Sequence, residues 1–349
     1  MSDIQRILFI PDAGPHVGGG HVMRSLTLAE ALGQRGGACV FMASPQVAAV
    51  LDAFAPEIPR VPADGRSAVE LMDADARAFD AVVFDHYGLS QGEHLTIARG
   101  RPSMALDDLA DRSLAVDMVL DSGPQRRAED YEGLIPAGSR LLLGPAYAPV
   151  RPQFAALRAP ALARRGGPVE RVLVSLGLTD LDGITARVLD RVRPRLGEVA
   201  LDVVLGGAAP TLTGLERLAR RDSRLNVHVD TRDMAKLTAH ADFAVGAAGS
   251  SVWERCTLAL PSLLLVLAPN QRPAAAAFAE LGAALVVDAA APDFESAFDR
   301  AFTRLSTDAE LRARLAAKSA EVCDGLGAGR VADAFLDLIA AKRRSDTPL

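Results

Sequence analysis

Apolar runs of strand length alternate with segments of helical period along most of this chain, and this alternation limits the possible folds more than any other feature. In the first half we expect strands at 6–10, 38–42, 81–84, 104–106 and 118–120, with helices near 22–32, 45–54, 90–98 and 126–132. The runs are nearly continuous in Val, Ile, Leu and Phe, which is typical of parallel strands buried on both faces. The pattern therefore predicts βαβ units and an α/β fold.

The second half repeats this opening of strand, glycine turn and helix. Strands are expected at 169–176, 201–205, 226–229, 243–245, 262–267 and 284–287, and an acidic cap at 179–182 begins a helix that ends near residue 192. A chain of 349 residues exceeds what one hydrophobic core usually organises. We predict two Rossmann-like domains that face each other across a cleft, with ligands at the carboxyl ends of the strands.

The predicted domain boundaries follow from composition. Residues 1–150 form the first domain, and 151–168, rich in Pro, Ala and Arg without a clean period, form a linker. Residues 169–325 form the second domain. The helical C-terminus, 326–349, is expected to pack back across the domains as a closing element.

Composition excludes several classes of function. The formal net charge is −6 and arginines are scattered among acids, so we expect no nucleic-acid partner. The longest aliphatic run, 258–267, is broken by Pro261 and is too short to cross a bilayer, and we expect no secretory leader before the first strand. We expect a cytoplasmic protein with no membrane partner, no obligatory protein partner and no cofactor. The widely spaced Cys39, Cys256 and Cys323 are expected to be buried apolar residues.

The segment 18–24, Gly-Gly-Gly-His-Val-Met-Arg, joins the first strand to the first helix and places a histidine at the junction. Glycines allow a sharp turn and close approach to a ligand, and the first turn of a helix carries unpaired N–H groups. In that positive potential His21 is expected to be mostly neutral and able to accept a proton. Gly20 and Arg24 are expected to contact the substrate. An ordinary glycine turn with a histidine at the helix start also fits this segment.

Polar residues also follow the strand at 81–84. Asp85 is expected to orient His21 or polarise water, and His86 is a second candidate base. A strand-end turn with partly buried polar groups is the alternative interpretation. Asp107 and Asp108 end another strand, and we expect a helix N-cap there and no metal site, since no third ligand stands at supporting spacing.

The segment 246–254 opens a helix after the strand at 243–245 and resembles an anion-binding turn. Gly249 lets a phosphate approach the backbone, and Ser250 and Ser251 add hydroxyl donors. Glu254 suits the two hydroxyls of a ribose, although Ser251 and Glu254 also have the spacing of a capping box.

Asn270 and Gln271 follow the next strand, 262–267, at the same edge of the predicted sheet. Their amides could hydrogen-bond sugar hydroxyls or N-acetyl groups beside the anion-binding turn. Asn270 also fits the N-cap of the next helix.

These motifs together resemble a known family, the pseudaminic acid pathway UDP-sugar hydrolases, which act on UDP-2,4-diacetamido-2,4,6-trideoxy-β-L-altropyranose. The resemblance runs in order to about residue 330. It is carried by 19–29, Asp85-His86-Tyr87-Gly88-Leu89, 107–112, 143–147 with Arg151-Pro152-Gln153-Phe154, and 246–261 with Asn270-Gln271.

The resemblance implies the two-domain glycosyltransferase-B fold, related to the enzyme that adds N-acetylglucosamine to lipid II. It also implies inverting hydrolysis, with water activated by His21, the pyrophosphate bound by 249–251, the ribose by Glu254, and no metal. Downstream, it implies pseudaminic acid, a nonulosonic acid used in flagellin glycosylation. The expected site residues are, as catalytic, His21, Asp85 and Tyr87, and as substrate-binding, Gly20, Arg24, His86, Gly249, Ser250, Ser251, Glu254, Asn270 and Gln271.

Two departures from the family pattern bear on sugar selectivity. Leu178 stands where a second glycine is expected, and Ser122-Gly123 replaces two amides after Asp121. Three other functions remain open on the sequence: a glycosyltransferase of the same fold, a hydrolysing UDP-sugar 2-epimerase, and a binding module without turnover. A nicotinamide dehydrogenase is disfavoured because Met23 occupies the position of the third fingerprint glycine.

Overall fold

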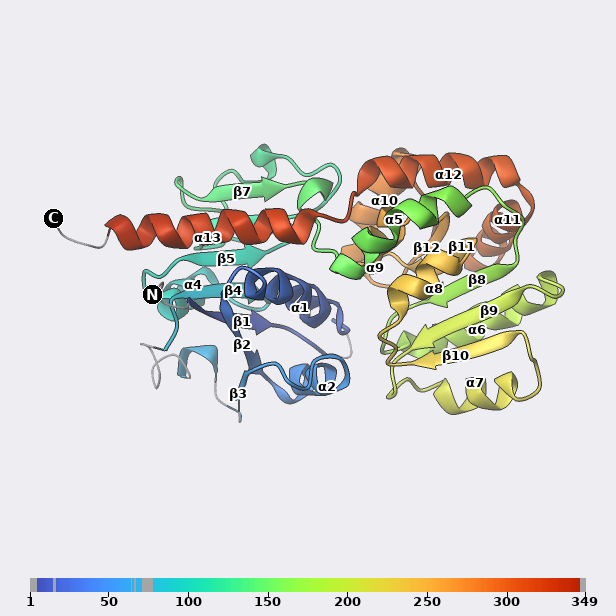
Figure 1. Ribbon diagram of the computed structural model, residues 1–349, viewed down its shortest axis with the longest axis horizontal. Helices are drawn as coiled ribbons and strands as arrows, with labels where there is room; N and C mark the ends of the chain where they lie inside the picture. Colours follow the sequence, from blue (N-terminus) through green and yellow to red (C-terminus); the bar gives the residue numbers. More distant parts are fainter. Residues whose placement is uncertain (1–4, 15–16, 64, 66, 71–77, 346–349) are drawn as a thin grey trace. The chain divides into compact units, whose positions relative to one another are not determined.

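The computed structural model describes residues 5–14, 17–63, 65, 67–70 and 78–345. The chain divides into two compact units. Unit 1 comprises Met1–Pro149 and Leu326–Leu349, and unit 2 comprises Val150–Gly325 (Figure 1). Each unit is built around one sheet with helices on its faces, so the predicted α/β class is confirmed.

The sheet of unit 1 has seven strands in the order β3-β2-β1-β4-β5-β6-β7, and neighbouring strands run parallel. The strands are β1 (Arg6–Pro11), β2 (Ala38–Ala43), β3 (Arg60–Pro62), β4 (Ala81–Asp85), β5 (Ser103–Leu106), β6 (Met118–Asp121) and β7 (Arg140–Leu143). The order reverses between β1 and β4. Ligands bind at such a reversal, outside the carboxyl ends of the two strands.

Helices cover both faces of this sheet because successive strand residues point to opposite sides. Ile7 and Phe9 pack in one core with α1, α2 and α13, while Leu8 and Ile10 pack in another core with Ile97 of α4. The described helices of unit 1 are α1 (Gly20–Gly33), α2 (Pro45–Phe54), α4 (Gln91–Ala98) and α13 (Gly327–Ser345), with 3₁₀ turns η1 (Ala128–Tyr131) and η2 (Pro145–Tyr147).

The C-terminal helix α13 returns to unit 1. It packs against α1, and its buried residues Val331, Phe335 and Ile339 belong to the same core as Ile7 (Figure 1). A Cβ at Gly327 would lie on the backbone of Ala148, so glycine is required where the helix begins.

The sheet of unit 2 has six parallel strands in the order β10-β9-β8-β11-β12-β13. The strands are β8 (Arg171–Ser175), β9 (Ala200–Leu205), β10 (Leu225–Val229), β11 (Phe243–Ala247), β12 (Ser262–Val266) and β13 (Leu285–Asp288). Here the order reverses between β8 and β11, which places the segment after β11 at the ligand-binding edge of the sheet.

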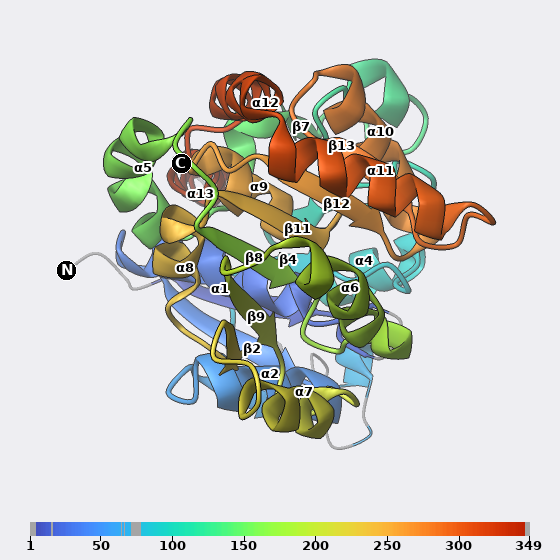
Figure 2. The same ribbon diagram turned by 90° about the vertical axis from the view of Figure 1, so that its right-hand side faces the viewer.

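Helices again lie on both faces, as Figure 2 shows for α6 and α11 on one side of the sheet and α5 and α8 on the other. The helices of unit 2 are α5 (Pro152–Arg164), α6 (Ile184–Val192), α7 (Leu212–Ala219), α8 (Met234–His240), α9 (Ser251–Thr257), α10 (Arg272–Glu280), α11 (Phe294–Thr307) and α12 (Ala309–Val322). Short 3₁₀ turns occur at η3 (Leu181–Gly183), η4 (Arg193–Arg195) and η5 (Pro269–Gln271). The acidic cap expected at 179–182 does not occupy the N-cap of α6, which is Gly183 and makes no side-chain capping bond. Asp180 Oδ1 instead accepts a hydrogen bond from the backbone N–H of Thr185, in the first turn of the helix, at 2.9 Å.

Some local predictions were wrong. The helix expected at 126–132 is only the 3₁₀ turn η1, and the stretch 151–168, expected as an irregular linker, contains the helix α5. The three cysteines are buried, as expected. In the described part of the chain, no helix has both the length and the apolar character needed to cross a membrane.

Candidate active site

The turn between β1 and α1 brings His21 to the carboxyl edge of the unit 1 sheet. Gly18 has φ +74°, a left-handed conformation that favours glycine, and α1 begins at Gly20 with Gly19 as its N-cap. His21, the second residue of the helix, is 6% exposed. The first turn of α1 holds no acidic residue.

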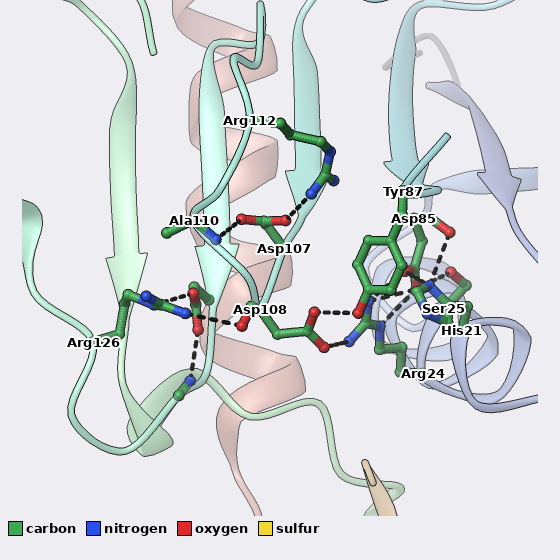
Figure 3. A network of polar contacts seen from close by, with 12 residues as sticks. His21, Arg24, Ser25, Asp85, Tyr87, Asp107, Asp108, Ala110, Arg112 and Arg126 are labelled. Carbon is green, nitrogen blue, oxygen red and sulfur yellow. Dashed lines mark hydrogen bonds and ion pairs between the residues drawn. The ribbon is translucent and has the colours of Figure 1, made fainter. Parts of the chain in front are cut away.

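Asp85, the last residue of β4, holds the histidine ring (Figure 3). Its Oδ1 lies 2.5 Å from Nδ1 of His21, and the carboxylate is wholly buried. Burial alone would raise the pKa of Asp85, but Arg24 and His21 outweigh burial and hold that pKa well below its usual range. The ionised carboxylate only accepts hydrogen bonds, so we assign the ring proton to Nδ1. In the neutral ring, Nε2 then carries the lone pair that can accept a proton.

Arg24 is bound by two carboxylates. Its Nε and Nη2 donate to the two oxygens of Asp85 at 2.8 and 2.6 Å, and Nη1 donates to Oδ2 of Asp108 at 2.9 Å. Burial opposes the charge of the guanidinium, but the two aspartates raise the pKa of Arg24 well above its usual value. Ser25 adds a hydroxyl donor to Asp85 at 3.1 Å. Three of the five guanidinium N–H groups are therefore used inside the protein, and they give Arg24 a positioning role in this network.

Tyr87 completes the surroundings of His21. Its ring stands edge-on to the imidazole, with centroids 4.6 Å apart, and its hydroxyl donates to Oδ1 of Asp108. Burial, with the neighbouring Asp108, raises the pKa of the Tyr87 hydroxyl, so it remains protonated at neutral pH. Asp108 thus joins Arg24 and Tyr87, and the pKa of its carboxyl is lowered because Arg24 and the Tyr87 hydroxyl outweigh burial.

A second buried network supports the loop that carries Asp108. Tyr131 places its hydroxyl 2.9 Å from Asp107 and 2.8 Å from Asp121. Arg126 donates to Asp121 at 2.5 Å, and it donates to the backbone carbonyl of Asp108 at 2.9 Å, as Figure 3 shows. The predicted N-cap at 107–108 was wrong. No helix follows, and Asp107 instead accepts from the backbone N–H of Ala110 in a turn.

His86 takes no part in the His21 network through any contact in the described residues. Its Nδ1 accepts the backbone N–H of Gly88 at 3.0 Å, and its Nε2 lies 3.9 Å from Asp12. Of the three residues 85–87, Asp85 and Tyr87 therefore contact His21, whereas His86 accepts a hydrogen bond within the turn that follows β4.

In unit 2, the segment from Gly246 to Ser251 joins β11 to α9 at the point where the strand order reverses. The capping box considered for Ser251 and Glu254 does not form. The N-cap of α9 is Ser250, and its side chain makes no capping hydrogen bond. Glu254 is instead held by Arg151, whose Nη2 and Nε donate to the same oxygen, Oε1, at 2.7 and 2.9 Å. The other oxygen of Glu254 makes no hydrogen bond within the described residues. One carboxylate oxygen is thus fixed and the other can accept a hydroxyl.

Gln271 lies beside this turn. Its Oε1 accepts the backbone N–H of Leu267 at 2.9 Å, which directs Nε2 toward Gly249, where a Cβ would lie 3.7 Å away. Asn270 is exposed and is not the N-cap of α10, a position that Gln271 occupies. Gln271 therefore presents an amide donor at the glycine turn.

The structure shows the backbone contacts at the two departures from the family pattern. The carbonyl of Leu178 accepts the backbone N–H of Gly206 at 3.0 Å, and a Cβ at position 206 would lie 2.6 Å from that oxygen. Gly123 donates its N–H to Oδ1 of Asp121 at 2.7 Å, and a Cβ there would lie 2.9 Å from the same oxygen. These contacts explain glycine at 206 and at 123, and nothing in the structure explains leucine at 178. Among the residues that the structure describes, no three His, Cys, Asp or Glu side chains are grouped as metal ligands.

Comparisons with known proteins agree with this architecture. No protein family model matches the chain. Over 280 residues it is 23% identical to the UDP-2,4-diacetamido-2,4,6-trideoxy-beta-L-altropyranose hydrolase of Campylobacter jejuni, covering 79% of this chain and 97% of that protein. It is 28% identical over 207 residues to the spore coat polysaccharide biosynthesis protein SpsG of Bacillus subtilis, covering 58% of this chain and 60% of that protein. The resemblance predicted from the motifs is confirmed.

Solved structures of similar architecture cover nearly the whole chain. Acinetobacter baumannii MurG matches with a TM-score of 0.64 at 18% identity, over 95% of this chain and 99% of that one. The calicheamicin glycosyltransferase CalG4 matches with a TM-score of 0.60 at 18% identity, over 99% and 100%. MnaA of S. aureus, solved with UDP, matches with a TM-score of 0.62 at 14% identity, over 97% and 98%. The chain has the glycosyltransferase-B fold.

Within this glycosyltransferase-B chain, the predicted site residues fall into two groups, one in each unit. Unit 1 brings together His21, Arg24, Asp85 and Tyr87, adjoining Gly20, while unit 2 gathers Gly249, Ser250, Ser251, Glu254 and Gln271 around one turn. The sequence did not predict the contact of Asp108 with Arg24 or the role of Arg151 in holding Glu254. Asp108 was visible as a strand-end acid, but no local spacing links it to Arg24.

Proposed function

We propose that this protein hydrolyses a UDP-linked 2,4-diacetamido-2,4,6-trideoxyhexose at the anomeric carbon, with inversion. The observation that carries the proposal is the buried pair of His21 and Asp85, in which Nδ1 is held at 2.5 Å and Nε2 is left as a base. Its expected place is the cytoplasm, in the synthesis of pseudaminic acid for flagellin glycosylation.

In the proposed reaction, Nε2 of His21 takes a proton from water as the water oxygen forms a bond to C1 of the sugar. The bond between C1 and the diphosphate oxygen breaks, and its electrons leave with UDP. Asp85 stabilises the imidazolium that forms, as a carboxylate beside a general base does. Tyr87 packs on the ring and limits its rotation.

The second part of the proposal concerns the binding of UDP by unit 2. The turn 246–251 binds the diphosphate through backbone N–H groups and the hydroxyls of Ser250 and Ser251, with Gln271 as a further donor. Glu254 accepts the ribose hydroxyls with the oxygen that Arg151 leaves free. The Campylobacter relative is named a hydrolase of such a sugar nucleotide, and the S. aureus protein was solved with UDP, which supports this choice of substrate.

The experiment that tests the reaction uses water labelled with ¹⁸O and a UDP-diacetamido-trideoxyhexose, without any acceptor. We expect free sugar and UDP in equal amounts, with the label in the sugar and none in UDP, because the bond broken is to C1. Proton NMR of the first-formed product should show the inverted anomer with unchanged configuration at C2. Label in UDP would mean attack on phosphorus and would refute the proposal.

The glycosyltransferase neighbours favour one alternative, transfer to an acceptor hydroxyl. It predicts little sugar release without an acceptor, while a 2-epimerase predicts an altered configuration at C2.

His21→Asn should lower turnover by about 10²-fold or more and keep UDP affinity. His240→Asn, which changes an exposed histidine on α8, is the matched control and should keep full turnover.

A further inference from the structure

Arg255 is a buried arginine in the first turns of α9, directly behind the turn 246–251. It is 3% exposed. Its Nη2 donates to the carbonyl of Ala247 at 2.6 Å, and its Nη1 donates to the hydroxyl oxygen of Ser251 at 3.0 Å. Its Nε is buried without a hydrogen-bond partner in the described part of the chain. The guanidinium therefore spans the turn from its start to its end.

In the part of the chain that the structure describes, no carboxylate pairs with this guanidinium. Within the described residues, Arg255 forms no ion pair, and the neighbouring acid, Glu254, is engaged by Arg151. Burial lowers the pKa of Arg255 to about 10, which still leaves it charged at neutral pH. A buried charge without an opposite charge is unfavourable, so a site of this kind gains stability when an anion arrives.

The guanidinium is pressed against the backbone of the turn. A Cβ at Gly246 would lie 2.5 Å from Nη1 and 2.7 Å from Cζ of Arg255, closer than real contacts allow. Glycine at this position therefore serves to admit the arginine. The positive charge lies immediately under the segment to which the proposed function assigns the diphosphate.

Ser251 connects the charge to the surface of the turn. Its hydroxyl oxygen accepts from Arg255, so its own O–H proton is free to donate outward. A hydroxyl that accepts from a cation is polarised and donates more strongly. The partial exposure of Ser251 leaves that proton accessible to a ligand.

We propose that Arg255 is a positioning residue that supplies, through Ser251, the buried positive charge that binds the diphosphate of the nucleotide. This inference rests on the proposed function, because it takes UDP as the ligand of the turn. This role can be told from a purely structural one, because the contribution of Arg255 to binding affinity must grow with the negative charge of the ligand.

The test compares the affinities of three ligands of increasing charge, namely uridine, UMP and UDP, by calorimetry. Arg255→Met should weaken UDP binding on the order of tenfold or more, because a unit charge a few ångströms away is removed. Uridine affinity should change less than twofold, and UMP should fall between. Arg255→Lys keeps the charge, so it should retain most of the preference for UDP over uridine. If the methionine variant does not fold, a loss of that preference in Arg255→Lys overturns the inference.

A matched control is Arg312→Met. Arg312 is 6% exposed, lies in the same unit and donates to carbonyls at the end of α11, with no ion pair in the described residues. Its replacement should leave the ratio of UDP to uridine affinity unchanged.

A double variant tests the role of Ser251. In a protein that already carries Ser251→Ala, Arg255→Met should cost less UDP affinity than it does alone, because the hydroxyl that carries the effect of Arg255 is already gone.

Two outcomes separate the inference from the proposed function. If the unaltered protein binds UDP no better than uridine, the proposed function fails and the inference fails with it. If it prefers UDP, but Arg255→Met weakens uridine and UDP equally, only the inference is overturned. A preference for UDP that survives in both Arg255 variants overturns it as well.

Discussion

Replacing Asp85 by asparagine tests whether this residue is the group that makes His21 a base. The wild-type carboxylate accepts from Nδ1 of His21, from two nitrogens of Arg24 and from the hydroxyl of Ser25, and it has no exposed surface. An amide of the same shape has only one accepting oxygen. If that oxygen faces Arg24, the NH₂ group faces His21, so Nδ1 must accept and the ring proton moves to Nε2.

The expected loss can be worked out from these contacts. With the proton on Nε2, the ring no longer accepts a proton from water, and removal of a general base lowers the rate by about 10²-fold to 10⁴-fold. That loss corresponds to roughly 3 to 5 kcal/mol in the activation barrier. The variant also leaves Arg24 with Asp108 as its carboxylate partner, and breaking a buried pair costs about 3 to 5 kcal/mol of stability.

The assay measures kcat, KM and urea denaturation for Asp85→Asn beside a matched control, Asp202→Asn. Asp202 is also a buried aspartate, 1% exposed, that binds a histidine, His228, and an arginine, Arg171, in the other unit. Both variants should lose stability, but only Asp85→Asn should lose kcat. Equal kcat losses in the two variants, or a kcat within threefold of wild type for Asp85→Asn, would refute the assignment of the Nδ1 proton.

Three further predictions concern residues around the site and the core. Tyr87→Phe keeps the ring against His21 but loses the bond to Asp108, so kcat should fall less than tenfold, and a larger fall would give the hydroxyl a direct role. Burial lowers the pKa of His94 from 6.5 to about 4, so the unfolded chain binds its proton first and stability should fall on the order of 3 kcal/mol from pH 7 to pH 4. Urea titrations should show that loss reduced in His94→Phe, and an equal loss in both proteins would contradict it. Phe335→Ala, which empties a fully buried position of α13, should cost about 3 to 5 kcal/mol by the same method, and a cost below about 1 kcal/mol would argue against the docking of α13.

Much of the fold could be predicted because each central strand is a continuous apolar run buried on both faces. The run that begins at Arg6 shows this, since β1 is wholly buried after its first residue. The edge strand β3 was missed because it has only one aliphatic residue, Val61, between Arg60 and Pro62. The edge strand β7 was missed although it contains three leucines, of which only one is buried. The helix α5 was hidden by Pro160 within it and by the absence of a clear apolar stripe.

The candidate site was predictable where chemistry follows from the position of a residue at a strand or helix end. His21 and Asp85 are of this kind, because β1 and β4 flank the reversal in strand order. Of the two roles expected for Asp85, orienting His21 or polarising water, the hydrogen bond to Nδ1 fits the first. The partners of arginines were not predictable. Arg24 reaches an aspartate 84 residues away, and Arg151 reaches a glutamate 103 residues away, so no local spacing records either contact.

The different partners of two arginines indicate which unit receives the anionic part of a ligand. Arg24 is surrounded by Asp85 and Asp108, so its charge is balanced within the protein, and a phosphate near it would be repelled by both carboxylates. Arg255 has no such balance in the described residues and lies under a turn whose backbone and hydroxyls can donate. Because a buried charge is stabilised by an opposite charge, this difference supports the proposal that the anionic part of the ligand binds at the turn of unit 2. Under the same proposal, the balanced network of unit 1 fixes the proton of His21, a task for which rigidity matters more than net charge.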